Sequence, residues 1–175
     1  IRDKLVTGVQ TCALPISMSA DIQLRHRLGG FTLDAAFAFG REPGVTALFG
    51  PSGAGKTTML HAIAGLLRPE SGRIVLNGET LLDTEKGIFV PACARRIGVV
   101  FQDSRLFPHL NVKANLLFGW QRAQTKSDAS RIDAVIALLG LEQLLARRPR
   151  TLSGGERSRV ALGRALLMNP RARLL

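Results

Sequence analysis

A glycine-rich run in the first third of the chain constrains the fold more than any other feature. It matches a phosphate-binding loop at every fixed position and reads Gly50, Pro51, Ser52, Gly53, Ala54, Gly55, Lys56, Thr57, Thr58. The apolar, β-branched residues 45–49 before it predict a short buried strand, and residues 58–64 after it predict a helix. Strand, loop and helix in this order predict a nucleoside triphosphate site in an α/β fold.

The chemistry of phosphate binding explains these residue types. Glycines allow successive backbone N–H groups to turn toward phosphate oxygens, and the following helix adds the positive end of its dipole. Lys56 is expected to reach the β and γ phosphates, and Thr57 is expected to place its hydroxyl on a bridging Mg²⁺. The loop predicts the ligand but leaves the class of enzyme open.

A second glycine motif lies far downstream, at Leu152-Ser153-Gly154-Gly155-Glu156. Ser153 and Glu156 have the spacing of a capping box, which begins many ordinary helices, and residues 157–167 are rich in helix formers. Such a box does not require the two glycines between its caps. Because Gly154 and Gly155 have no side chains, the N–H groups of the first turn are accessible to an anion. The motif therefore predicts a second phosphate-binding surface.

The two motifs in this order resemble the phosphate loop and signature of ATP-binding cassette (ABC) ATPases. The resemblance implies ATP and Mg²⁺ as cofactors and a head-to-tail homodimer. In that dimer Ser153, Gly154 and Gly155 would meet the γ-phosphate of ATP held by Lys56 and Thr57 of the second copy. ATP binding would close the dimer, and hydrolysis would reset it.

A third stretch, residues 97–102, is an apolar strand that ends in Gln102 and is similar to the Q-loop of this family. The resemblance makes Gln102 the candidate catalytic residue, sensing Mg²⁺ and the attacking water. Thr57 and Gln102 are therefore the candidate Mg²⁺ contacts. A single Gln after a strand would mean little without the glycine motifs on either side of it.

Residues 72–78, 85–88 and 101–110 resemble the ATPase subunit of bacterial molybdate importers. Sulfate, polyamine and sugar importers share much of this pattern, usually without the Glu-Lys-Gly-Ile of residues 85–88. The resemblance covers about residue 20 to the end. It implies two membrane permease subunits, an indirect periplasmic binding protein, and a peripheral location on the cytoplasmic face of the inner membrane. The loop at Phe107, Pro108 and Leu110 is expected to meet a permease.

Three other classes of protein also use a phosphate loop. A DNA-repair or chromosome ATPase would insert long coiled coils between the two glycine motifs, and no sustained heptads lie there. A ribosome-associated cassette protein would carry two cassettes in one chain. A small-molecule phosphotransferase would explain the phosphate loop but not residues 152–156.

The chain departs from the family pattern in two places. Cassettes often stack adenine on an aromatic residue upstream of the loop, but this chain has no Tyr and carries His26-Arg27-Leu28 there. Phe31 is the nearest aromatic alternative, and it could equally face the core. The family's Asp-Glu pair and switch histidine, expected after residues 171–175, do not occur. The 175 residues are therefore expected to bind ATP without hydrolysing it.

The expected domain organisation is a leader, residues 1–17, that resembles extraneous translated sequence before Met18, followed by a partial nucleotide-binding domain over residues 18–175. The expected fold is a C-terminally incomplete P-loop NTPase with an antiparallel β lobe and a helical lobe at about residues 103–150. Alternating apolar residues in 23–49 predict the antiparallel strands.

Turn and helix signals divide the rest of the chain. Residues 69–72 predict a turn before a strand at 74–76, and Asn77-Gly78 predicts a hairpin. Ile132, Val135, Ile136 and Leu139 have helical spacing, and Gly140 is the expected stop.

Composition excludes several classes of protein. At 175 residues and 46% apolar the chain is long enough for a packed core, and no stretch approaches the roughly 18 apolar residues of a membrane span. Cys12 and Cys93 offer no disulfide framework. The net charge of +11 comes mostly from scattered Arg without aromatic interleaving, so no nucleic-acid partner is predicted.

Overall fold

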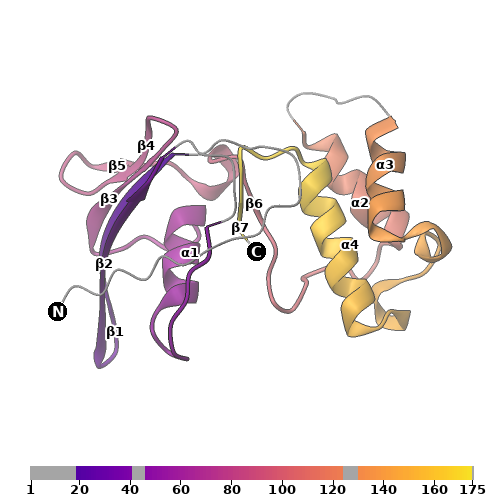
Figure 1. Cartoon of the computed structure of the whole chain (residues 1–175), viewed down its shortest axis with the longest axis horizontal. Coiled ribbons are helices and arrows are strands. Elements are labelled where there is room, and N and C mark those ends of the chain that lie inside the picture. The colour runs from indigo at the N-terminus through magenta and orange to yellow at the C-terminus, as the bar shows by residue number, and fades with distance from the viewer. Residues whose placement is uncertain (1–18, 41–45, 124–129, 175) are drawn as a thin grey trace. The chain divides into compact units, whose positions relative to one another are not determined.

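The computed structural model describes residues 19–40, 46–123 and 130–174, which form two compact units divided after Arg95. The leader predicted at residues 1–17 lies outside the described residues. The first unit contains a five-stranded antiparallel sheet with the order β2-β1-β3-β4-β5, and one helix (Figure 1). Its elements are β1 (Ala20–Leu28), β2 (Phe31–Phe39), α1 (Lys56–Ala64), β3 (Ser71–Leu76), β4 (Glu79–Asp83), β5 (Ile88–Phe89) and the 3-10 turn η1 (Ala92–Ala94).

Local sequence explains the sheet. Ile22 and Leu24 alternate with polar residues on β1 and are 2% and 3% exposed, as a half-buried strand requires. Asn77 and Gly78 join β3 to β4 with φ of 53° and 82°. Both values are positive, as the tight hairpin turn predicted at this dipeptide requires. The antiparallel strands, the hairpin and the helix after the phosphate loop are thus confirmed.

The buried strand predicted at residues 45–49 is wrong for residues 46–49, and Val45 lies outside the described residues. Residues 46–49 have no strand assignment, and Leu48 and Phe49 are 39% and 70% exposed. An apolar, β-branched run becomes a strand only where a neighbouring strand supplies hydrogen bonds. Within the described residues, neither sheet includes residues 46–49.

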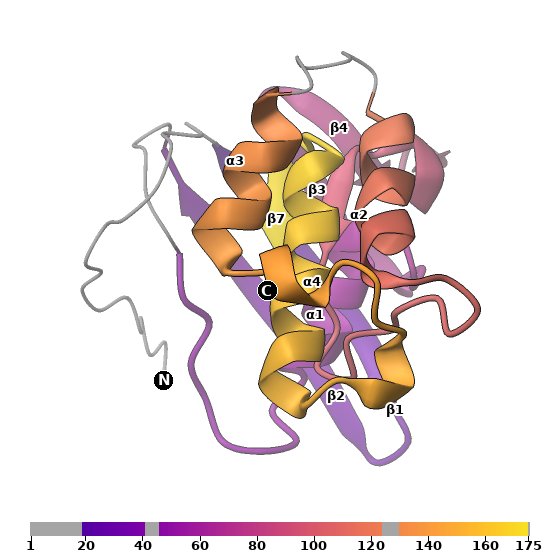
Figure 2. The same cartoon turned by 90° about the vertical axis from the view of Figure 1, so that its right-hand side faces the viewer.

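The second unit is mostly helical. A short parallel pair joins β6 (Ile97–Val99) to β7 (Ala172–Leu174). Helices α2 (Val112–Gln121) and α3 (Ser130–Leu139) both pack against α4 (Gly154–Leu167), as Figure 2 shows. The 3-10 turns η2 (Glu142–Leu144) and η3 (Pro149–Thr151) connect α3 to α4. Gly140 follows α3 with a φ of 58°, which confirms it as the helix stop.

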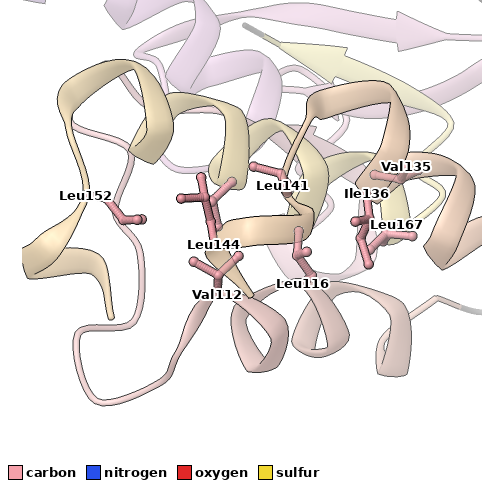
Figure 3. Close-up of a cluster of buried hydrophobic side chains, with 9 residues drawn as sticks. Val112, Leu116, Val135, Ile136, Leu141, Leu144, Leu152 and Leu167 are labelled. Carbon is pink, nitrogen blue, oxygen red and sulfur yellow. The ribbon is translucent and has the colours of Figure 1, made fainter. Parts of the chain in front are cut away.

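The core of the second unit is a cluster of branched aliphatic side chains between these helices (Figure 3). Its buried members are Val112, Leu116, Val135, Ile136, Leu141, Leu144, Leu152, Val160 and Leu167. Gly163 of α4 lets the helices approach, because a Cβ there would lie 2.8 Å from Leu116 Cδ2. The helical spacing predicted for Val135 and Ile136 is confirmed, since both are buried in this cluster.

Candidate functional site

The phosphate loop of the first unit leads directly into α1. Gly53 and Gly55 have φ of 83° and 84°, a left-handed conformation that only glycine adopts without strain. Gly55 is the N-cap of α1, and within the described residues no side chain caps this helix and its first turn holds no acidic residue. The first backbone N–H groups of a helix lack partners inside the helix and attract anions. The start of α1 therefore has the backbone geometry that a phosphate-binding loop requires.

Lys56 and Thr57 occupy the first turn of α1. The Lys56 ammonium donates to the carbonyl oxygens of Gly50 and Pro51, each at 2.7 Å, so the lysine folds back along its own loop. Thr57 is exposed. The residues fit a triphosphate, because free N–H groups, one ammonium and one hydroxyl gather at one helix end.

An exposed apolar pair lies at the tip of the β1–β2 hairpin. Phe31 is 42% exposed and pairs in register with Leu28, which is 38% exposed. A Cβ built on Gly55 would lie 3.3 Å from Phe31 Cε1 and 3.0 Å from Leu33 Cδ1. Phe31 is therefore not a buried core residue, and its ring borders the phosphate loop.

The predicted capping box opens α4 in the second unit. The Ser153 N–H donates to Glu156 Oε2 at 2.6 Å, and the Glu156 N–H donates to Ser153 Oγ at 3.3 Å. Gly154 and Gly155 are exposed, and a Cβ on either would meet no atom within 4 Å. The box thus satisfies two N–H groups and leaves the glycine face of the first turn open to a ligand.

The box makes the stability of α4 depend on pH. Hydrogen bonds from the Ser153 backbone and hydroxyl hold the pKa of Glu156 below its usual value of 4.5. Because the folded pKa is lower than the unfolded one, this stabilisation is present above pH 4.5 and is lost as pH falls through the folded value. We expect Glu156→Gln to remove this part of the acid dependence of the melting temperature. Identical acid profiles for the variant and the original chain would contradict the assignment.

Gln102 shares a hollow with the start of α4. The hollow has a volume of about 350 Å³ and is lined by Gln102, Asp103, Ser104, Gly154, Arg157 and Ser158. The structure thus brings together two of the predicted motifs of the second unit. The phosphate-loop residues 50–58 belong to the first unit.

Sequence reasoning missed the residue that holds the Gln102 loop. Ser104 and Arg105 have φ of 59° and 37°, which non-glycine residues seldom adopt. Arg164 of α4 donates from Nη2 to the Arg105 carbonyl at 2.9 Å and lies 5.0 Å from the centre of the Phe107 ring. Nothing in the local sequence marks Arg164, because its partners are 57 to 60 residues away.

None of the helices in the described residues is long and apolar enough to cross a bilayer. No group of three or more His, Cys, Asp or Glu in residues 19–40, 46–123 and 130–174 forms a metal site.

Curated relatives match most of the chain. A molybdenum import ATP-binding protein (ModC) of Rhizobium johnstonii is 55% identical over 159 residues, which are 90% of this chain and 44% of that protein. A protein of the same name from Brucella abortus is 56% identical over 157 residues, 88% of this chain and 42% of that protein. The chain therefore spans less than half the length of these relatives.

Solved structures agree in fold. CbiO1 of Clostridium perfringens, described as part of the ABC transporter complex cbiONQ, has a TM-score of 0.60 and 25% identity, covering 91% of this chain and 64% of that one. The ATP-binding cassette MJ0796 was solved as a dimer bound to ADP and Pi. It has a TM-score of 0.57 and 26% identity, and the match covers 87% of this chain and 70% of that one. The family described as ABC transporter matches residues 39–175, which include both glycine motifs. The chain therefore belongs to the ABC transporter family and carries part of its ATP-binding domain.

Proposed function

We propose that this protein is the ATP-binding subunit that drives an ABC importer for molybdate. The main support for ATP binding is the start of α1. Gly55 is its N-cap, no described side chain caps it, and Lys56 and Thr57 lie in its first turn. The MJ0796 cassette, which has a similar fold, was solved with ADP and Pi, and this supports a nucleotide as the ligand here.

Within this proposal each motif has a role. The glycine loop and Lys56 hold the β and γ phosphates, and the Thr57 hydroxyl provides one ligand for Mg²⁺. Mg²⁺ would supply charge neutralisation of the phosphates when bound. Gln102 would sense Mg²⁺ and the attacking water.

The proposed partners follow from the relatives. Two copies would meet head to tail, so that the open first turn of α4 in one copy contacts the nucleotide of the other. The dimeric state of the MJ0796 cassette supports this arrangement. Two permease subunits would complete the importer, with the loop at Phe107, Pro108 and Leu110 against them, on the cytoplasmic face of the membrane.

Molybdate is proposed as the cargo because both relatives described above are named for molybdenum import. A hybrid gene tests this, in which the matched segment of the Rhizobium johnstonii protein is replaced by this chain. In a strain that lacks its molybdate importer ATPase, the hybrid should restore molybdoenzyme activity. If the hybrid instead restored only sulfate, polyamine or sugar import in strains lacking those ATPases, the cargo would be wrong.

Phe31 is the proposed platform for the base. Stacking of an aromatic ring on a base contributes about 1–3 kcal/mol. Phe31→Ala should therefore weaken ATP binding about tenfold while leaving the affinity for inorganic triphosphate unchanged. Phe37→Ala is the matched control, since Phe37 lies on the same strand and stacks with Phe39 at 6.3 Å. Equal losses for ATP and triphosphate would show that Phe31 supports the loop and does not touch the base.

A further inference from the structure

A buried arginine binds the far end of the phosphate-loop helix. Arg95 is 0% exposed, yet its guanidinium donates to four backbone carbonyls of the first unit. The bonds run from Nη1 to Ala62 O at 2.7 Å and Ile63 O at 2.8 Å, from Nε to Val90 O at 2.6 Å, and from Nη2 to Leu81 O at 3.3 Å. One side chain thus joins the end of α1 to the β4–β5 hairpin.

The chemistry of a helix end favours a cation at this place. Ala62 and Ile63 lie in the last turn of α1, where carbonyl groups lack the regular helical partner four residues on. The Ala62 carbonyl accepts a turn bond from the Gly65 N–H at 3.1 Å and has a second lone pair for Arg95. A positive charge near the carboxyl end is also stabilised by the helix dipole. Arg95 meets both conditions, and its planar fork reaches the helix and the hairpin at once.

Gly65 and Phe89 lie beside the guanidinium of Arg95. Gly65 follows α1 with a φ of 77°, and a Cβ there would lie 2.6 Å from Arg95 Nε and 2.9 Å from Cζ. The Phe89 ring centre lies 5.2 Å from the guanidinium carbon. A glycine beside the charge and an aromatic ring near it leave space for a guanidinium bound at this position.

The opposite end of α1 carries the phosphate site. The helix has nine residues, with Lys56 and Thr57 in its first turn. Such a helix is a rod of about 13 Å, so fixing its last turn fixes the direction of its first N–H groups. We propose that Arg95 is a positioning residue for the phosphate loop, holding α1 so that Lys56 and the first turn point at the triphosphate. This inference rests on the proposed ATP binding.

Titration of the 175-residue chain with a fluorescent ATP analogue tests it. Arg95→Ala should raise the Kd about tenfold or more, because the first turn is no longer preorganised. Arg95→Lys keeps the positive charge but loses the planar guanidinium and its several N–H donors, so a smaller rise in Kd is expected. A purely structural role would lower the fraction of chain that binds and leave the Kd of the folded fraction unchanged. The number of sites and the Kd are therefore fitted separately, at a temperature where each variant is folded by circular dichroism.

Asp83→Asn is the matched control. Asp83 is 6% exposed on β4, and its carboxylate lies 4.0 Å from both Arg73 Nε and Lys86 Nζ. The variant therefore removes two ion pairs of the same unit without removing the bonds from Arg95 to α1. It should lower stability and leave the Kd unchanged. Added guanidinium, but not methylammonium, should restore ATP affinity to Arg95→Ala.

The outcomes separate the inference from the proposed function. If the original chain binds the ATP analogue and Arg95→Lys binds it with the same Kd, the positioning role is overturned, even where Arg95→Ala does not fold. An equal rise in Kd for Asp83→Asn would overturn it too. If the original chain binds no nucleotide, both the proposed function and the role of Arg95 are wrong.

Discussion

Replacing Lys56 with alanine should reduce the affinity of the chain for ATP about 100-fold. The ammonium lies at the start of α1, and a charged hydrogen bond contributes about 1.5–3 kcal/mol. Lys56 is already held along the loop by the carbonyl oxygens of Gly50 and Pro51, both at 2.7 Å, so little ordering is required when phosphate arrives. Equilibrium titration with ATP measures the effect directly.

Lys86→Ala is the control for the loss of charge. Lys86 belongs to the same unit, its side chain is 71% exposed, and it lies on the β4–β5 hairpin. This variant should bind ATP as the original chain does. If Lys56→Ala and Lys86→Ala lowered the affinity by similar amounts, ATP would be attracted by net charge and not by the phosphate loop.

Replacing Gly119 with alanine should strongly destabilise the second unit. Gly119 lies on α2 and is buried, and a Cβ there would come within 2.2 Å of the Arg164 carbonyl oxygen on α4. That atom belongs to a helix backbone and cannot move aside as a flexible side chain would. Overpacking costs about 1–3 kcal/mol or more, which outweighs the gain of about 1 kcal/mol from a better helix former. Urea denaturation followed by the fluorescence of Trp120, the single tryptophan, measures the change.

Gly155→Ala provides the matched comparison, because it makes the same substitution on α4. A Cβ on Gly155 meets no atom within 4 Å, so helix propensity alone acts and the free energy of unfolding should stay the same or rise by up to about 1 kcal/mol. Opposite signs for the two variants would support the close contact of α2 and α4. A destabilisation of similar size in both would contradict it.

Features that depend on neighbouring residues in the chain could be predicted from the sequence. Asn77-Gly78 and Gly140 need positive φ for local reasons, and the turn and the helix stop occur where expected. The reciprocal bonds of Ser153 and Glu156 span three residues, so the capping box was also predictable. The family was predictable because its two glycine motifs are short and continuous.

Features that depend on distant partners could not be predicted in this way. The apolar pattern of residues 46–49 does not show whether a neighbouring strand will pair with it. Arg95 binds carbonyl groups up to 33 residues away, and its place in the sequence gives no sign of burial. The exposure of Phe31 could not be predicted either, because it depends on how the tip of the β1–β2 hairpin packs beside Gly55.

Titration of the purified chain with ATP, ADP and adenosine in the presence of Mg²⁺ tests whether the phosphate loop binds a nucleotide. We expect saturable binding at one site per chain. ATP and ADP should compete for this site, and adenosine should compete far more weakly, because it can stack on Phe31 but carries no phosphate for the start of α1. Absence of saturable ATP binding by the folded chain, or binding of adenosine as tight as that of ATP, would show that the start of α1 is not a nucleotide phosphate site.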